Sequence, residues 1–233
     1  MDMRTSPRQK MKLVMVGNGW DGAYNHLHAI GESVGLKRED MIFPGHVSDL
    51  ELLQLYNQCT LFVFPSLREG FGLPVLEAMA SGAVAIGSNV TSIPEVIGCV
   101  EALFDPTSIE AIRDKIVECV TDEALYARLK DHALKQAQNF SWERSAIVAL
   151  DAIERCYSTL GIAERKYRLS IRGGEGQYLG TDEQWADAED HLRGALNARS
   201  IEYVEAKGEA AFYGPKIDVQ VRDAHGREET LST

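Results

Sequence analysis

Short apolar runs alternate with amphipathic stretches along the first 160 residues of the chain. The runs have the length and composition of buried parallel strands, and they lie at 12–16, 41–43, 60–64 and 83–87. The stretches between and after them repeat apolar residues at helical spacing, and residues such as Ser48 and Ser141 are suited to capping a helix. Because strands that alternate with helices favour parallel pairing, the pattern predicts an α/β fold, a parallel Rossmann-like sheet with helices on both faces.

The pattern changes after residue 160. Residues 166–172 and 216–222 alternate polar and apolar positions as half-exposed strands do, and 181–199 has helical spacing with acids in its first turn. A strand is predicted at 201–204, and 227–233 returns beside 216–222 as a hairpin. We therefore predict two domains, 1–160 and 161–233, the second a small α+β antiparallel segment.

One stretch organises the first domain. The apolar run 60–65 is followed by a turn in which Gly70 and Gly72 flank an aromatic residue. Pro74 suits the first turn of a helix, where a missing N–H costs nothing, and Gly82 supplies the stop. The sequence thus predicts a strand, a glycine turn and a helix that begins at the carboxyl edge of a parallel sheet.

Two carboxylates flank the start of this helix. A helix N-terminus carries free N–H groups and about half a positive charge, which suits a phosphate or diphosphate. Glu69 lies in the turn, and Glu77 lies about one turn inside the helix. Acids beside an anion site are suited to accept hydrogen bonds from sugar hydroxyls.

These residues, together with 89–97, resemble the C-terminal, donor-binding domain of retaining GT-B-type glycosyltransferases (glycosyl transferases group 1) over about 12–157. The resemblance implies that Glu69, the catalytic candidate, contacts the donor sugar and that Glu77 contacts the nucleotide ribose. It implies that sugar and diphosphate meet the amides of Gly70, Phe71, Gly72 and Leu73. The turn that contains Val47 matches the place where the family holds the base, although an ordinary strand-exit loop explains it equally well.

The resemblance also predicts missing parts. Complete relatives have an earlier strand in this domain, a following loop whose Arg and Lys neutralise the diphosphate, and an N-terminal acceptor-binding domain, none of which this sequence matches. Loss of the cationic loop removes electrostatic stabilisation of the leaving diphosphate. We therefore expect nucleotide-sugar binding with little or no transfer by this chain alone.

The last part of the chain, about 164–233, resembles an internal piece of the catalytic domain of threonyl-tRNA synthetase. The resemblance is carried by 178–185, 226–233 and above all by Gly208-Glu-Ala-Ala-Phe-Tyr-Gly-Pro-Lys-Ile-Asp218. It implies that Tyr213 and Lys216 face a threonine and adenylate site, whereas the residues alone favour a solvated lysine at a hairpin entrance. The family's zinc ligands and ATP-clamping arginine are not matched, so aminoacylation and tRNA binding are not expected.

Composition and charge bear on the partners, the compartment and the metal content of the protein. The 233 residues are ordinary for a soluble globular protein, and a net charge of −11 argues against broad nucleic-acid binding. No apolar run is long enough to span a bilayer and no signal peptide follows the first methionine, so we expect a cytoplasmic protein. The four scattered cysteines favour free thiols, and no histidine or cysteine spacing indicates a metal.

The function that we predict is binding of a nucleotide-diphosphate sugar, without a cofactor, by half of a retaining hexosyltransferase. One alternative is a fragment of a threonine–tRNA ligase, whose zinc and ATP belong to complete relatives. Another is a fused or chimeric chain in which neither site is used. In that case uncovered sheet edges, where a strand or domain is missing, favour self-association.

Overall fold

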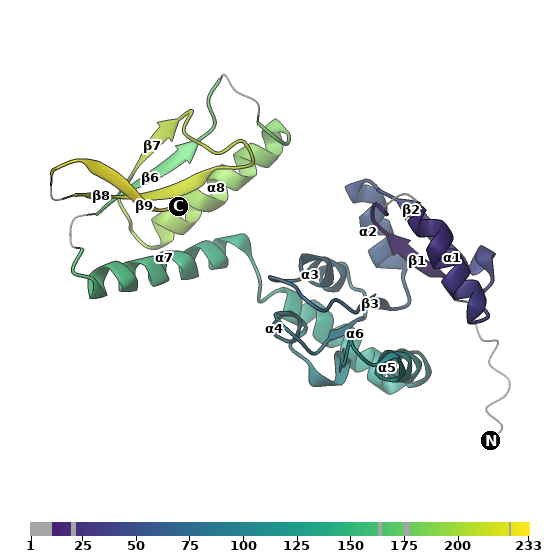
Figure 1. The fold of residues 1–233 in the computed structure, drawn as a ribbon. Coiled ribbons are helices and arrows are strands. Elements are labelled where there is room, and N and C mark those ends of the chain that lie inside the picture. The colour runs from purple at the N-terminus through teal and green to yellow at the C-terminus, as the bar shows by residue number, and fades with distance from the viewer. Residues whose placement is uncertain (1–10, 20–21, 163–164, 175–177, 224) are drawn as a thin grey trace. The chain divides into compact units, whose positions relative to one another are not determined.

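The computed structural model describes residues 11–19, 22–162, 165–174, 178–223 and 225–233 (Figure 1). The chain divides into two compact units, Met1–Ala137 and Gln138–Thr233, which we call unit 1 and unit 2. The described elements of unit 1 are β1 (Leu13–Val16), α1 (Ala23–Ser33), β2 (Met41–Gly45), α2 (Asp49–Gln58), β3 (Phe62–Phe64), α3 (Leu73–Ala80), β4 (Ala85–Ser88), α4 (Ile93–Ile97), β5 (Leu103–Phe104), α5 (Ile109–Thr121) and α6 (Glu123–Ala137). Those of unit 2 are α7 (Trp142–Thr159), β6 (Arg165–Ile171), α8 (Asp182–Ala198), β7 (Tyr203–Lys207), β8 (Lys216–Arg222) and β9 (Glu228–Ser232).

Unit 1 has the predicted α/β architecture, with its parallel strands in two separate sheets rather than one. β1 pairs with β2, and β3–β4–β5 form a second sheet in that order. Doubly wound sheets commonly have the strand order 3-2-1-4-5-6, in which the first strand separates the second from the fourth. The two described sheets, β2-β1 and β3-β4-β5, agree with the parts of that order on either side of its central strand.

The core of unit 1 surrounds β4, whose four residues are all buried. Helices α3, α4 and α6 supply most of the apolar side chains that cover it, among them Met79, Ile93 and Leu129. A strand that is buried on both faces is rich in apolar residues, which explains why 83–87 is a continuous apolar run. The sequence analysis did not predict α4 and β5, because five and two residues are too short for a clear period.

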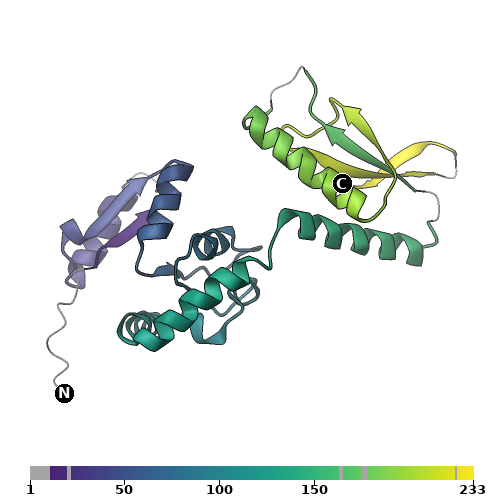
Figure 2. The same ribbon diagram turned by 180° about the vertical axis from the view of Figure 1, so that it is seen from behind.

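Unit 2 is a four-stranded sheet with helices on one face. The strand order is β7-β6-β8-β9, and α8 runs along the sheet with α7 packed beside it (Figures 1 and 2). The predicted hairpin β8–β9 is antiparallel, as is β6–β8. The sheet is mixed rather than wholly antiparallel, since β7 runs parallel to β6. The reason is that α8 connects these two strands, and a helical crossover returns the chain in the same direction.

The boundary between the units differs from the predicted domain boundary. The compact units divide after Ala137, whereas the sequence pattern divides after residue 160. Helix α7 accounts for the difference, because Leu150 and Tyr157 are buried in one cluster with Leu169, from β6. Its start is as predicted, with the Ser141 hydroxyl accepting the N–H of Arg144 at 3.1 Å. Where the two sequence resemblances meet stays a prediction.

Candidate functional site

The turn between β3 and α3 ends on a glycine that no other residue can replace without strain. Gly72 is the N-cap of α3 with φ 106° and ψ 45°, in the left-handed region. A Cβ added there would lie 2.6 Å from Cδ1 of Ile93, which is fully buried. Gly70, by contrast, has a negative φ and open space around its Cα. Of the two predicted glycines, Gly72 is therefore the one that the backbone requires.

The N-terminus of α3 has backbone N–H groups that donate no hydrogen bond within the described residues. Val75 and Leu76 donate to the carbonyl of Gly72 at 3.0 and 3.3 Å, and Pro74 has no N–H. Within the described residues, the N–H groups of Gly72 and Leu73 donate to no other group. Leu73 itself is exposed, whereas Gly72 is buried. This arrangement is the local geometry that binds an anion.

The segment at 89–97 holds the turn in place. The Ser92 hydroxyl donates to the carbonyls of Phe71 at 2.8 Å and Glu69 at 3.2 Å. The N–H of Glu69 donates to Oγ1 of Thr91 at 3.3 Å, and Thr91 itself has a φ of 56°. The structure thus brings together the two stretches that carry the glycosyltransferase resemblance. The sequence analysis did not predict the roles of Thr91 and Ser92, although a hydroxyl-rich loop after a strand was a usable signal.

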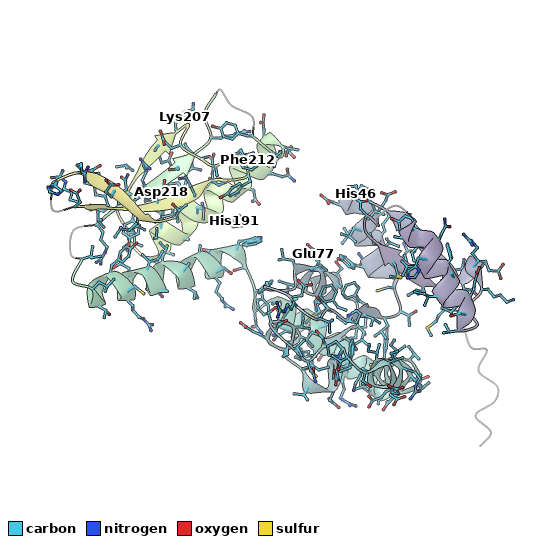
Figure 3. All side chains as sticks on the ribbon, viewed as in Figure 1. His46, Glu77, His191, Lys207, Phe212 and Asp218 are labelled. Atoms are coloured by element: carbon cyan, nitrogen blue, oxygen red, sulfur yellow. The ribbon has the colours of Figure 1, made fainter. Side chains whose placement is uncertain are left out.

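Of the two predicted acids, Glu77 has a fixed partner. The Tyr56 hydroxyl of α2 donates to Oε2 of Glu77 at 3.1 Å, while the Glu77 side chain remains exposed on α3 (Figure 3). Burial, and then the nearby Glu77 carboxylate, raise the pKa of Tyr56 above its ordinary value, so the phenol stays a donor. Glu69 is half-buried, and in the described part of the chain its carboxylate accepts no hydrogen bond.

Val47 lies in the loop between β2 and α2. Its side chain is half-buried, and Gly45 before it has a φ of 76°. The next residue, Ser48, forms a complete capping box with Glu51 at the start of α2. These hydrogen bonds fix the loop to α2, and its predicted contact with a nucleotide base stays a prediction.

Unit 2 contains a cluster of polar side chains, of which the sequence analysis named only Lys216 as a candidate site residue. Asp218 is completely buried on β8 (Figure 3). It accepts from the Ser170 hydroxyl at 2.7 Å, Nζ of Lys216 at 2.9 Å, the Thr233 hydroxyl at 2.7 Å and Arg168 at 3.2 Å. Arg168 faces Asp218 and Ser170 faces Lys216 across the β6–β8 pair, so alternation along two strands places all four on one face.

The electrostatics of this cluster favour the charged carboxylate. Burial alone would raise the pKa of Asp218, but the hydrogen bonds from Ser170, Lys216, Thr233 and Arg168 outweigh it and lower the pKa to about 2. Lys216 is thus engaged with Asp218. Tyr213 is exposed and packs edge-on against Phe212, with ring centroids 5.1 Å apart. The implied threonine and adenylate role of Tyr213 and Lys216 stays a prediction.

A cavity of about 400 Å³ in unit 2 contains none of the predicted site residues. Its two arginines are paired with carboxylates, Arg165 with Glu154 and Arg199 with Asp151. Across the described residues no group of three or more His, Cys, Asp or Glu side chains is arranged to hold a metal ion. Among the described helices, none combines the length and the apolar character needed to cross a membrane.

A parallel α/β unit with a glycine turn and a helix tip beside two acids defines a domain of the doubly wound class. The chain belongs to the family described as "Glycosyl transferases group 1", whose model matches residues 3–136. It is 52% identical over 126 residues to the serotype-specific mannosyltransferase WbdA of Escherichia coli, covering 54% of this chain and 16% of that protein. These matches confirm the first predicted resemblance.

A second relative matches a different part of the chain. Threonine–tRNA ligase of Streptococcus gordonii is 47% identical over 87 residues, covering 36% of this chain and 13% of the ligase. This match confirms the second predicted resemblance, to a fragment of that enzyme. The chain thus spans less than a fifth of the length of either curated relative.

A solved structure supports the fold. Sucrose-phosphate synthase from Thermosynechococcus elongatus superposes with a TM-score of 0.54 at 25% identity, covering 64% of this chain and 39% of that one. The predicted α/β class is therefore confirmed, together with its likeness to a glycosyltransferase domain.

Proposed function

We propose that unit 1 binds a nucleotide-diphosphate sugar at the tip of α3, with the diphosphate on the N–H groups of Gly72 and Leu73. The observation that carries the proposal is the left-handed Gly72, which ends the turn so that these N–H groups are left without an internal partner. The family supports the same ligand, because the resemblance implies that sugar and diphosphate bind at this segment.

The two acids have separate roles in this proposal. Glu77, oriented by Tyr56, accepts hydrogen bonds from the ribose hydroxyls, and the half-buried Glu69 accepts them from the donor sugar. A carboxylate accepts through two oxygens, and a hydrogen bond to a charged group contributes about 1.5–3 kcal/mol. Val47 contacts the base, and the binding needs no metal.

The donor that we propose is a mannosyl donor, because the curated relative at 52% identity is named a mannosyltransferase. Chemistry in this family needs an acceptor site and a cationic clamp on the diphosphate in addition to the donor site. The described residues supply the donor side, so we expect binding of the donor with little transfer by this chain alone.

Calorimetric titration of the full chain with GDP-mannose tests the proposal, with free mannose as the control ligand. We expect Glu77→Ala to weaken binding at least about tenfold, since the loss of one charge-assisted hydrogen bond exceeds about 1.4 kcal/mol. Glu118→Ala is the matched control, because that exposed glutamate lies on α5 and forms only a surface ion pair with Lys115.

A further variant separates ligand binding from local structure. Tyr56→Phe removes the hydroxyl that donates to Glu77 but leaves the carboxylate in place. It should weaken binding less than Glu77→Ala does. Equal affinities of the Glu77→Ala and Glu118→Ala variants, or no heat with millimolar GDP-mannose, would contradict the proposal.

A further inference from the structure

Thr91 has a backbone conformation that its residue type disfavours. Among the described residues other than glycine, Thr91 and Ser200 have a positive φ, of 56° and 53°. A β-branched residue such as threonine is a genuine outlier in this region, because its side chain crowds the backbone. Residues in such conformations persist where the surrounding structure imposes them, and they are concentrated at functional sites.

A helix end explains the conformation of Ser200 but not that of Thr91. Ser200 follows α8, and the N–H groups of Ser200 and Ile201 donate to carbonyls of that helix at 2.9 and 3.0 Å. Left-handed residues commonly end helices in this way. Thr91 follows β4 and precedes α4, so no helix ends at it. It has a contact of a different kind, because its Oγ1 accepts the N–H of Glu69 at 3.3 Å.

Ser92 departs from a second local preference. It is the N-cap of α4, a position at which a serine hydroxyl ordinarily accepts an N–H from the first turn of the helix. In this chain the hydroxyl makes no such bond. It donates instead to the carbonyls of Phe71 at 2.8 Å and Glu69 at 3.2 Å, which lie 21 and 23 residues earlier. The hydroxyls of Thr91 and Ser92 therefore both contact the turn before α3.

These two hydroxyls fix the backbone on both sides of the candidate site. The Glu69 carboxylate accepts no hydrogen bond in the described part of the chain, so its position depends on its backbone, which Thr91 holds at the N–H and Ser92 at the carbonyl. Ser92 also holds the carbonyl of the peptide group between Phe71 and Gly72. Because a trans peptide group is planar, this contact directs the Gly72 N–H the opposite way. That N–H donates to no other described group.

We propose that Thr91 and Ser92 are positioning residues for a nucleotide-sugar donor. Thr91 acts on the sugar through Glu69, and Ser92 acts on the diphosphate through the N–H of Gly72. This inference rests on the donor site proposed above for the tip of α3. The two hydroxyls act through other groups and do not touch the ligand themselves. Glycine would adopt the conformation of Thr91 without strain but has no hydroxyl, which gives a reason for a threonine at this place.

Thr91→Gly removes the hydroxyl and relieves the backbone strain, so a loss of binding cannot be ascribed to a strained fold. Ser200→Gly is the matched control, since it relieves the same left-handed φ on an exposed residue of unit 2. Thr91→Ser keeps a hydroxyl and is the rescue variant. Calorimetric titration of the full chain with GDP-mannose and separately with GDP measures the two affinities, so the contributions of the sugar and of the diphosphate are distinguished.

We expect Thr91→Gly to weaken binding of GDP-mannose about three- to tenfold, the equivalent of one hydrogen bond, and to leave binding of GDP unchanged. Thr91→Ser should restore the affinity of the unaltered chain, and Ser200→Gly should change neither affinity. Ser92→Ala should weaken both ligands by a similar factor, because GDP also carries the diphosphate that the Gly72 N–H binds. A role of Thr91 in folding alone would change both affinities together.

Hydrogen exchange of the free chain, read at single amides by NMR, gives a measurement that needs no ligand. Thr91→Gly should speed exchange at the Glu69 amide, which donates to Oγ1 of Thr91, and leave exchange in β4 unchanged.

Three results for Thr91→Gly would each overturn the role of Thr91: full affinity for GDP-mannose, an equal loss of affinity for both ligands, or native exchange at Glu69. Full affinity of Ser92→Ala for GDP would overturn the role of Ser92. In all these cases the unaltered chain still binds GDP-mannose, and the donor site itself stands. An unaltered chain that binds neither ligand would instead refute the donor site and this inference with it.

Discussion

Replacing Gly72 by alanine tests the geometry on which the candidate site depends. The residue has a φ of 106°, and for an L-residue the left-handed region costs about 1–2 kcal/mol. The added methyl would also lie 2.6 Å from Cδ1 of the fully buried Ile93, and overpacking a core costs about 1–3 kcal/mol. Together these terms predict that Gly72→Ala destabilises unit 1 by about 2–5 kcal/mol.

Gly70→Ala is the matched control, because it adds the same methyl two residues earlier, where φ is negative and no atom lies within 4 Å. Native-state hydrogen exchange of the full chain, read for peptides that cover 73–80 and 83–88, reports the free energy of opening in unit 1 alone. We expect a large loss of protection in Gly72→Ala and almost none in Gly70→Ala. If the two variants lose protection equally, the turn does not have the conformation described here.

Two further predictions concern parts of the chain away from the turn. The folded pKa of Asp218 is about 2, below its ordinary 3.8, so the ionised carboxylate stabilises unit 2 above about pH 4. This stability, about 2 kcal/mol in total, should be lost as the pH falls towards 2. Hydrogen exchange in β6 and β8, measured across an acid titration, checks this, and Asp218→Asn should flatten the pH dependence. Ser48→Ala removes the capping box of α2 and should cost about 1 kcal/mol, seen as faster exchange at 49–58 and unchanged exchange in unit 2. An acid profile that Asp218→Asn leaves unaltered, or a cap variant with native exchange, would contradict the respective argument.

The sequence predicted elements whose signals are local. The capping hydroxyls of Ser48 and Ser141 begin helices at the predicted places, and the apolar run 83–87 contains the buried strand β4. The signals that failed depend on tertiary contacts. The division of the parallel strands between two sheets has no local signal, and the parallel pairing of β6 with β7 follows from the crossover through α8.

The candidate site shows the same division. The glycines and acids of 69–77 stand out in the sequence because of their spacing, and the structure places them around one helix tip. Their supports, Tyr56 and Ser92, lie 21 residues from Glu77 and Phe71 along the chain. A hydrogen bond at that separation leaves no periodic signal. In unit 2 the contact of Lys216 with Asp218 could have been predicted from the sequence. Asp218 lies two residues further on the same strand, and alternation places both side chains on one face.

Helix α7 belongs to unit 2 by its packing. We predicted that the glycosyltransferase resemblance extends to about 157, whereas the family model ends at residue 136, before α7 begins. The apolar residues of this helix are buried against β6 and α8. Two acids of α7 also form ion pairs with other residues of unit 2, Glu154 with Arg165 and Asp151 with Arg199. Because burial of a large apolar side chain contributes about 1.5–3 kcal/mol, Leu150 and Tyr157 are substantial parts of the core of unit 2. Helix α7 is therefore part of the hydrophobic core of unit 2.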